Sequence, residues 1–332
     1  MAALRPPAQP VPPALRVLVL GGGGFIGRHA VAALLAQGAA VQVGSRHPER
    51  LDRRLPVAAQ ACPRRRVRFE RLLEAQDWAP LLDEVDVVLN CVGILRERGR
   101  ETYQRVHHEA PAALAEACRR AGRRLVHVSA LGLQAPMRSG FLRSKADGEA
   151  ALRGSGADCC IVRPSLLDAE VGGYGAAWIR RVARWPVHVL PADARGLIAA
   201  LDVRDLGQAL AALAHRPRLA TPAGPGEFEL GGDTALALGD YLAAMRRRRA
   251  ARPAWRIVVP GLLARLASHA CDLLHLTPFS FGHWELLRRD NVPAANALPG
   301  LLGRAPRRVV DDRPPAALGL PPGRQRLTGE VD

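Results

Sequence analysis

The stretch Leu15–Gly27, LRVLVLGGGGFIG, decides the fold that the sequence predicts. Its apolar first half is short and rich in Val and Leu, which is typical of a strand buried on both faces of a parallel sheet. Gly21, Gly24 and Gly27 then follow the spacing G-x-x-G-x-x-G, and a helix is expected over Arg28–Gln37. Glycines let the backbone approach a pyrophosphate closely, and a helix N-terminus offers free N–H groups to phosphate. Strand, glycine turn and helix together predict a dinucleotide site.

Strand-like and helix-like segments alternate through the rest of the first half of the chain. Further strands are expected over Ala40–Gly44, Val67–Phe69, Asp86–Cys91, Arg124–Ser129 and Cys159–Val162. Helices are expected over Trp78–Glu84, Gln104–Ala121 and Ser144–Arg153, and Pro111 either kinks the second of these or marks its true start. This alternation predicts an α/β fold with a doubly wound parallel sheet of the Rossmann type.

The second half loses this rhythm and predicts a smaller, mostly helical C-terminal portion. Strands are expected over Ala200–Val203 and Phe228–Leu230, and helices over Trp178–Trp185, Arg204–Ala214, Leu238–Arg249 and Pro260–Leu276. We therefore expect four parts: a flexible tail (1–14), an NAD(P)-binding Rossmann domain (15–165), a substrate-binding or cap portion partly interleaved with the Rossmann core (166–305), and a second flexible tail (306–332).

The helix expected over Pro260–Leu276 is amphipathic. Its apolar side carries Leu262, Leu263, Leu266, Ala270, Leu273 and Leu274, and its polar side carries Arg265, His269 and Asp272. We expect the apolar side to pack against the core. The alternative is a helix that lies on a membrane surface, although its polar side lacks the Lys/Arg enrichment usual for such helices.

Composition limits the class of protein. The chain has 332 residues, a hydrophobic content of 48% and a mean hydropathy of −0.03, which predicts a globular protein. The proline-rich N-terminus does not resemble a secretory signal, and no apolar run is long enough to span a membrane. The six cysteines lack C-x-x-C spacing, which favours reduced thiols over disulfides or a metal site. These features predict a cytoplasmic location.

The net charge of +16 indicates the kind of surface that this protein presents. The basic residues are scattered, with clusters at Arg64–Arg66 and Arg246–Arg249, and aromatic residues make up only 4% of the chain. Specific nucleic-acid binding is not expected because aromatic stacking platforms are lacking. Three interpretations remain: a solvated basic face, an acidic protein partner, or an anionic membrane that holds the protein peripherally at its inner face.

The end of the second strand indicates which cofactor is preferred. An acidic residue there would bind the ribose 2′-hydroxyl of NAD(H). The sequence has Ser45 and Arg46 instead, a hydroxyl and a guanidinium suited to a 2′-phosphate. NADP(H) is therefore the preferred cofactor, with NAD(H) still possible.

Lys145 is the single lysine among 47 Lys and Arg residues. A compact ammonium on a flexible stem can reach two ribose hydroxyls and can lower the pKa of a neighbouring phenol, where a guanidinium is too broad. This position therefore predicts a functional lysine.

The chain resembles the extended or atypical short-chain dehydrogenase/reductases, in particular the group with the NADPH-binding accessory subunit of respiratory complex I and its bacterial relatives. The stretches that carry the resemblance are Val19–His29, Asn90–Leu95, Val106–Gly122, Arg124–Gly132, Phe141–Glu149, Ile161–Leu167 and Thr277–Val292. These stretches are distributed over nearly the whole chain, and their order and spacing make the resemblance specific.

The resemblance implies roles for the catalytic positions. In such enzymes a serine polarises the carbonyl, and a tyrosine four residues before a lysine acts as acid/base. Ser129 and Lys145 match the serine and the lysine, whereas Phe141 stands in place of the tyrosine. The general acid is therefore missing. Tyr174, Asp168 and His188 are the candidate substitutes.

The resemblance also implies the cofactor contacts. The expected set is Gly21, Gly24, Phe25, Ile26, Gly27, Ser45, Arg46, Cys91, Val92, Gly93, Ser129, Lys145, Pro164 and Ser165. His107 is expected to be structural, and adenine contacts at Glu70 or Arg71 stay open. Two functions follow: an NADP(H)-dependent oxidoreductase with impaired or unusual catalysis on an unknown small molecule, or a non-catalytic NADPH-binding accessory protein docked on a membrane-associated partner.

Overall fold

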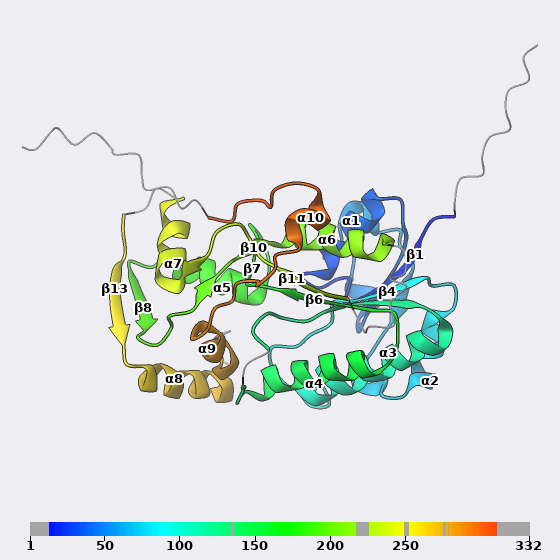
Figure 1. Cartoon of the computed structure of the whole chain (residues 1–332), viewed down its shortest axis with the longest axis horizontal. Coiled ribbons are helices and arrows are strands. Elements are labelled where there is room, and N and C mark those ends of the chain that lie inside the picture. Colours follow the sequence, from blue (N-terminus) through cyan, green and yellow to red (C-terminus); the bar gives the residue numbers. More distant parts are fainter. Residues whose placement is uncertain are drawn as a thin grey trace, which may run out of the picture.

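A computed structural model describes residues 13–133, 136–216, 226–248, 252–274, 277 and 279–310. Most of both expected tails lies outside these residues. Seven parallel strands form the central sheet in the order β11-β6-β5-β4-β1-β2-β3 (Figure 1). Their bounds are β1 (Arg16–Leu20), β2 (Ala40–Ser45), β3 (Arg64–Arg66), β4 (Val87–Asn90), β5 (Arg124–Val128), β6 (Cys159–Pro164) and β11 (Gly226–Leu230). The predicted doubly wound sheet is confirmed.

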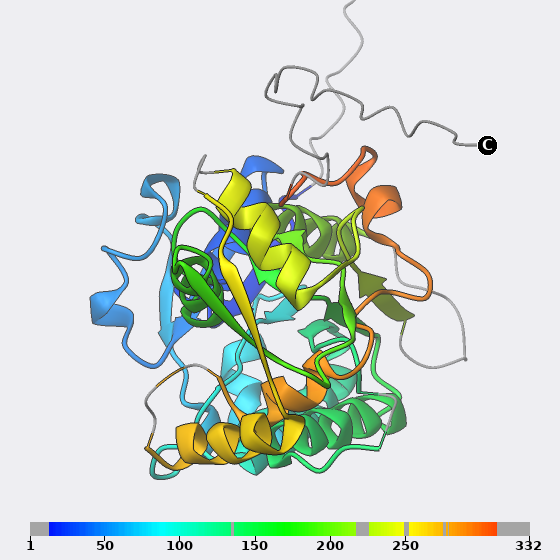
Figure 2. The ribbon, with the colours of Figure 1, turned by 90° about the vertical axis from the view of Figure 1, so that its left-hand side faces the viewer.

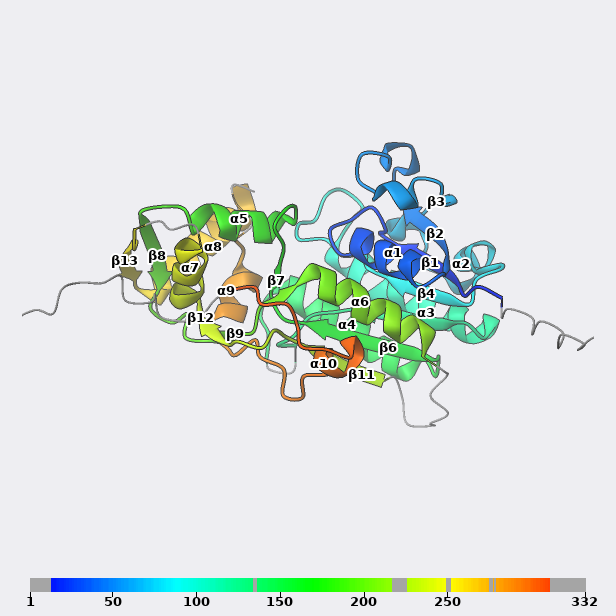
Figure 3. The same cartoon turned by 90° about the horizontal axis from the view of Figure 1, so that it is seen from above.

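Helices cover both faces of this sheet (Figures 1 and 3). One face carries α1 (Gly27–Ala36), α6 (Val203–His215) and α10 (Leu298–Leu302), and the other carries α2 (Ala75–Leu82), α3 (Ala110–Ala121) and α4 (Gly140–Gly154). In β1, Val17 and Val19 enter the core on one side, whereas Leu18 and Leu20 enter the core on the other. The strand needs apolar residues throughout because both of its faces are buried.

Three local predictions need correction. The third strand is Arg64–Arg66 and not Val67–Phe69: it pairs only with β2, and the chain then turns so that Val67 and Phe69 enter the core. The helix expected over Gln104–Ala121 is divided into a π-helical turn at Gln104–Glu109 and α3, with Pro111 in the first turn of α3. Helix α4 begins earlier than expected, at Gly140.

The cap (residues 166–305) consists of short strand pairs and helices at one end of the molecule (Figure 3). The pairs are β7 (Leu167–Asp168) with β10 (Leu201–Asp202), β8 (Val187–Pro191) with β13 (Trp255–Val259), and β9 (Leu197–Ile198) with β12 (Leu236–Ala237). The helices are α5 (Tyr174–Val182), α7 (Leu238–Arg247), α8 (Gly261–Leu274) and α9 (Phe281–Leu287). Between these, the chain returns to the sheet to add α6, β11 and α10.

Helix α8 does not bury the leucines of its predicted apolar side. Leu262, Leu263 and Leu266 are 66%, 56% and 58% exposed, whereas the buried residues of the helix are Ala264 and Ser268. The expectation that its apolar side packs against the core is wrong. No helix in the described ranges is long and apolar enough to cross a membrane.

Candidate functional site

The glycine turn after β1 is as compact as the sequence predicts. Gly21 has a φ of +72°, and its carbonyl oxygen accepts a hydrogen bond from the N–H of Gly24 at 2.8 Å. A Cβ on Gly27 would clash with that carbonyl and lie 2.7 Å from the Cα of Gly22. Within the described chain, the N–H groups of Phe25 and Ile26 have no hydrogen-bond acceptor. These free donors at the start of α1 form a cradle that fits a pyrophosphate.

The turn lies beside the end of β4, where the strand order of the sheet reverses. A Cβ on Gly21 would lie 3.1 Å from Val92 and 3.3 Å from the carbonyl oxygen of Cys91, so a side chain there would fill the space between the two loops. Asn90 holds the second loop by accepting the N–H of Val92 at 3.0 Å. Burial raises the pKa of Cys91 to about 12, so its thiol stays neutral. A crevice at this switch point is where doubly wound sheets bind their ligands.

Two polar groups lie where the resemblance predicts the nicotinamide end of the site, and neither has a partner among the described residues. The Ser129 hydroxyl is buried without a hydrogen bond there. The Lys145 ammonium pairs with no carboxylate in the described residues and lies 4.0 Å from where a Cβ on Gly93 would be. Burial lowers the pKa of Lys145 to about 8, against the opposing effect of Glu149. Orphaned polar groups of this kind fit a bound ribose and carbonyl, because such a ligand would satisfy them.

Phe141 lies on α4 one turn before Lys145, and aromatic rings surround it. The ring centroids of Tyr103, His107 and His283 are 5.6, 5.5 and 6.2 Å from that of Phe141, and the Lys145 Nζ is 5.8 Å from it. The nearby Tyr103 hydroxyl donates to the carbonyl oxygen of Leu95 at 2.9 Å. The position of the missing tyrosine therefore offers no hydroxyl to a substrate.

His107 is structural, as expected. Its Nε2 accepts the N–H of Ile94 at 3.1 Å, so its proton lies on Nδ1, which donates to Oγ of Ser144 at 3.1 Å. The Ser144 hydroxyl in turn donates to the carbonyl oxygen of Phe141. Burial, with the nearby Lys145 charge, holds the pKa of His107 well below its usual range. The imidazole therefore joins the π-helical turn, the loop after β4 and α4 without changing its charge.

The adenine end of the crevice is basic, but its arginines are paired. Ser45 ends β2, and the guanidinium of the next residue, Arg46, pairs with Glu101. Arg66, opposite Ser45 on β3, pairs with Glu49 at 3.1 Å. A 2′-phosphate would have to compete with Glu101 for Arg46. One oxygen of Glu70 is buried without a partner.

Ser165 already has a structural partner. Its hydroxyl lies 2.6 Å from the carbonyl oxygen of Asn291, which belongs to the segment after α9. Pro164 ends β6, and its carbonyl oxygen accepts the N–H of Leu131. The predicted nicotinamide contacts at Pro164 and Ser165 remain predictions.

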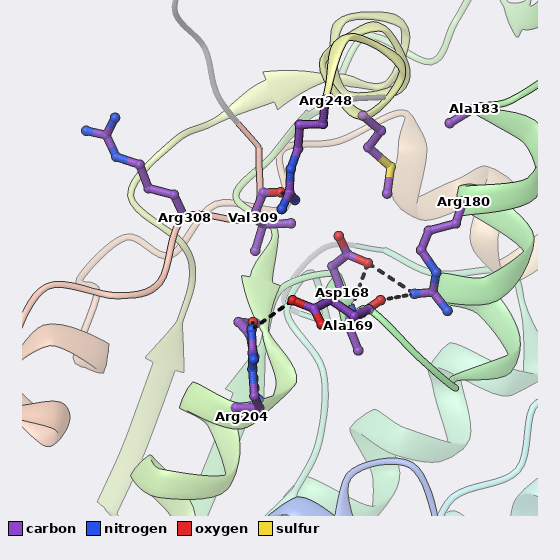
Figure 4. Close-up of a pocket in the computed structure, with 11 residues that line it drawn as sticks. Asp168, Ala169, Arg180, Ala183, Arg204, Arg248, Arg308 and Val309 are labelled. Carbon is purple, nitrogen blue, oxygen red and sulfur yellow. Dashed lines mark hydrogen bonds and ion pairs between the residues drawn. The ribbon is translucent and has the colours of Figure 1, made fainter. Parts of the chain in front are cut away.

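The candidate substitutes for the tyrosine lie in the cap. Asp168 accepts the N–H of Ala169, pairs with Arg180 at 3.2 Å, and lines a cavity of about 240 Å³ (Figure 4). The lining of this cavity includes Arg204, Arg248 and Arg308 but neither Ser129 nor Lys145. Burial raises the pKa of Asp168. His188 is buried on β8, beside β13, and the side chain of Tyr174 lies outside the described residues.

The sequence reasoning gave no role to α9, which forms part of the nicotinamide end. Glu285 accepts the N–H groups of Arg138 and Ser139 at 3.0 and 2.8 Å, and so joins α9 to the start of α4. A Cβ on Gly282 would lie 3.2 Å from the Phe141 ring. His283 stacks on that ring, and burial lowers its pKa to about 4. The only signal was that α9 falls within the resemblance at Thr277–Val292.

Comparisons with known proteins agree with this geometry. A family model described as NAD(P)H-binding matches residues 21–178. A ceramide reductase of Caulobacter vibrioides is 30% identical over 208 residues, which cover 61% of this chain and 62% of that protein. The mitochondrial NADH dehydrogenase [ubiquinone] 1 alpha subcomplex subunit 9 of Dictyostelium discoideum is 25% identical over 225 residues, or 68% of this chain and 61% of that protein. The chain thus spans about three fifths of the length of each relative.

Solved structures match the fold. The UDP-glucose 4-epimerase of Thermus thermophilus in complex with NAD is 21% identical, with a TM-score of 0.57 over 74% of this chain and 86% of that chain. This likeness shows a shared architecture only.

Proposed function

Since this chain has the NAD(P)H-binding domain, the relatives and the fold of an atypical short-chain dehydrogenase/reductase, we propose that it is an NADP(H)-dependent oxidoreductase that uses Lys145 as its proton donor. One observation carries the proposal. The Lys145 ammonium is unpaired and has a pKa lowered to about 8, while Phe141 leaves the usual acid's position without a proton. A catalytic acid works best when its pKa lies near the operating pH.

NADP(H) rather than NAD(H) is proposed because of the charge at the end of β2. Arg46 and Arg66 flank the Ser45 hydroxyl where a 2′-phosphate would lie, and β2 ends without an acidic residue. Glu101 holds Arg46 in the free protein, so the 2′-phosphate would replace one anionic partner with another. The affinity gained from this contact is therefore reduced by the loss of the Arg46–Glu101 pair.

The roles of the chain's own residues follow from their positions. The bound cofactor supplies the hydride. The Ser129 hydroxyl, which lacks a partner, donates a hydrogen bond to the carbonyl oxygen of the substrate and so polarises it. Lys145 delivers the proton to that oxygen as negative charge develops there. Phe141 keeps water away from the ammonium and maintains its lowered pKa.

The pH dependence of turnover tests this proposal. With carbonyl compounds, quinones and ceramide-like ketones as trial substrates, we expect turnover that is level below pH 8 and falls about tenfold per pH unit above it, as Lys145 loses its proton. Lys145→Arg keeps the positive charge but does not release a proton at these pH values, so it should bind NADPH and lose turnover by about 10²-fold or more. Phe141→Tyr should restore activity above pH 8. A pH profile that is level through pH 10, or full turnover in Lys145→Arg, would refute the role of Lys145.

The second candidate is a cofactor-holding protein without turnover. The aromatic cluster around Phe141 favours it, because these rings occupy the surroundings of the absent phenol. One relative is itself a subunit of a respiratory enzyme. NADPH fluorescence that rises on binding and then stays constant with every trial substrate, in the parent and in Phe141→Tyr, would favour this candidate.

A further inference from the structure

Helix α8 leaves the leucines of its apolar side exposed, and its inner contacts are made by Ala264, Ser268 and Asp272. Inside, Asp272 accepts the N–H of Phe281 at 2.9 Å and pairs with Arg96, and Ser268 is fully buried. Outside, Leu262, Leu263 and Leu266 are each more than half exposed. An apolar stripe on the outside of a well-anchored helix marks a surface that meets another apolar phase.

The preceding strand carries further exposed apolar side chains. Trp255, Ile257 and Val258 of β13 are 79%, 50% and 64% exposed, and only Pro260 separates β13 from α8. Val189 of β8 and nearby Trp185 add to it, at 57% and 43% exposure. Figure 2 shows β13 running down to α8 on the side of the molecule that faces the viewer. Exposed tryptophans beside leucines are typical of side chains that enter the interface of a bilayer.

The charges near this surface that lack an opposite partner among the described residues are positive. Three acidic residues near it already have arginine partners: Asp193 pairs with Arg288, Asp240 with Arg256, and Asp272 with Arg96. Within the described ranges Arg184, Arg252 and Arg265 are exposed and have no acidic partner. A symmetric contact between two copies would place these arginines against one another, which is unfavourable. An anionic surface satisfies them.

We propose that the apolar face of α8, with the adjoining side chains of β13 and β8, docks on an anionic lipid bilayer. The leucines and tryptophans enter the interfacial layer, and Arg184, Arg252 and Arg265 contact lipid headgroups. Arg96 follows the Cys91–Gly93 loop and holds α8 through Asp272. The docked face therefore lies next to the nicotinamide end of the crevice.

Vesicle binding by the full chain tests this proposal. We expect co-sedimentation with vesicles of phosphatidylcholine and phosphatidylglycerol, weaker binding to phosphatidylcholine alone, and a decrease with added salt. The double variant Leu262→Gln/Leu266→Gln should bind at least about ten-fold more weakly, because two apolar side chains are lost from the contact. Val57→Gln is the matched control, since Val57 is 83% exposed on the Rossmann domain, away from this face.

NADPH binding, measured on the same samples, shows that each variant is folded. Unchanged vesicle binding in the double variant would overturn the proposal, and so would the absence of binding by the parent protein. Light scattering tests whether a second copy of the chain binds this face instead. If the parent protein forms a dimer that the double variant does not form, and the parent does not bind vesicles, the face is a contact between copies and the proposal is overturned.

Discussion

The two ends of the cofactor crevice are built in different ways. The pyrophosphate end is formed by backbone atoms. It consists of the turn at Gly21, the close contact at Gly27 that leaves no room for a Cβ, and the free N–H groups at the start of α1. The nicotinamide end is made of side chains from β5, α4, the π-helical turn and α9, which are far apart in the sequence. The first end can bind a dinucleotide whatever the reaction, because phosphate binding needs only the turn. The second end decides whether a reaction follows, and at Phe141 it departs from the pattern that the resemblance implies.

Gly27→Ala should have the largest effect on NADPH binding, because it disrupts the glycine turn at the pyrophosphate end. Its Cβ would meet the carbonyl oxygen of Gly21 and the Cα of Gly22, and neither can move without opening the turn. We expect NADPH affinity to fall by about 10²-fold or more, and stability to fall by about 1–3 kcal/mol from overpacking. Calorimetric titration and urea unfolding measure the two effects. Gly175→Ala is the control, since no atom lies within 4 Å of its Cβ position; equal losses in both variants would show that the turn is not special.

Acid should destabilise the side-chain-built end. Burial lowers the pKa of His127 to about 3 and that of His283 to about 4, and it holds the pKa of His107 well below its usual range. As the pH falls below 6.5, each of these three histidines binds a proton in the unfolded chain before it does so in the folded chain. Stability therefore rises with pH across this window, and we expect a loss of about 1.4 kcal/mol per pH unit per histidine on acidification below 6.5. Urea unfolding between pH 7 and pH 4.5 measures it.

A histidine variant makes this test specific. His283→Asn should reduce the dependence of stability on pH by the contribution of one histidine. An identical slope in the parent and in His283→Asn would contradict the assignment.

Arg46→Ala should separate the two cofactors. We expect NADPH affinity to fall about tenfold, as for the loss of one charge-assisted hydrogen bond, with little change for NADH. Glu101→Gln should act in the opposite direction, because it releases Arg46 from its partner. Fluorescence titration with both cofactors measures the ratio. If Arg46→Ala reduced the affinities for NADPH and NADH equally, Arg46 would not bind the 2′-phosphate.

Ser129→Ala should have the smallest effect on stability. The buried hydroxyl has no partner, so its removal leaves no other group unpaired, and we expect a change within about 0.5 kcal/mol. Turnover should nevertheless fall, since the carbonyl would lose its donor. A loss of stability well above that range would mean that Ser129 is structural, like His107.

The sequence by itself determined the local features of this protein. Val- and Leu-rich runs followed by glycine specify a buried strand and a turn. The order of these elements was enough for the doubly wound sheet. Such features depend on interactions within a few residues, so the pattern of residue types contains them.

Only the tertiary structure decided how distant segments meet. It brought His283 and Gly282 against Phe141, and it paired Arg46 with Glu101. It also left the leucines of α8 exposed: the apolar periodicity shows which residues share a face, whereas the contacts of Ala264, Ser268 and Asp272 decide which residues point inward. Which side of a helix is buried depends on the segments that pack against it, and the residues of the helix alone do not specify those segments.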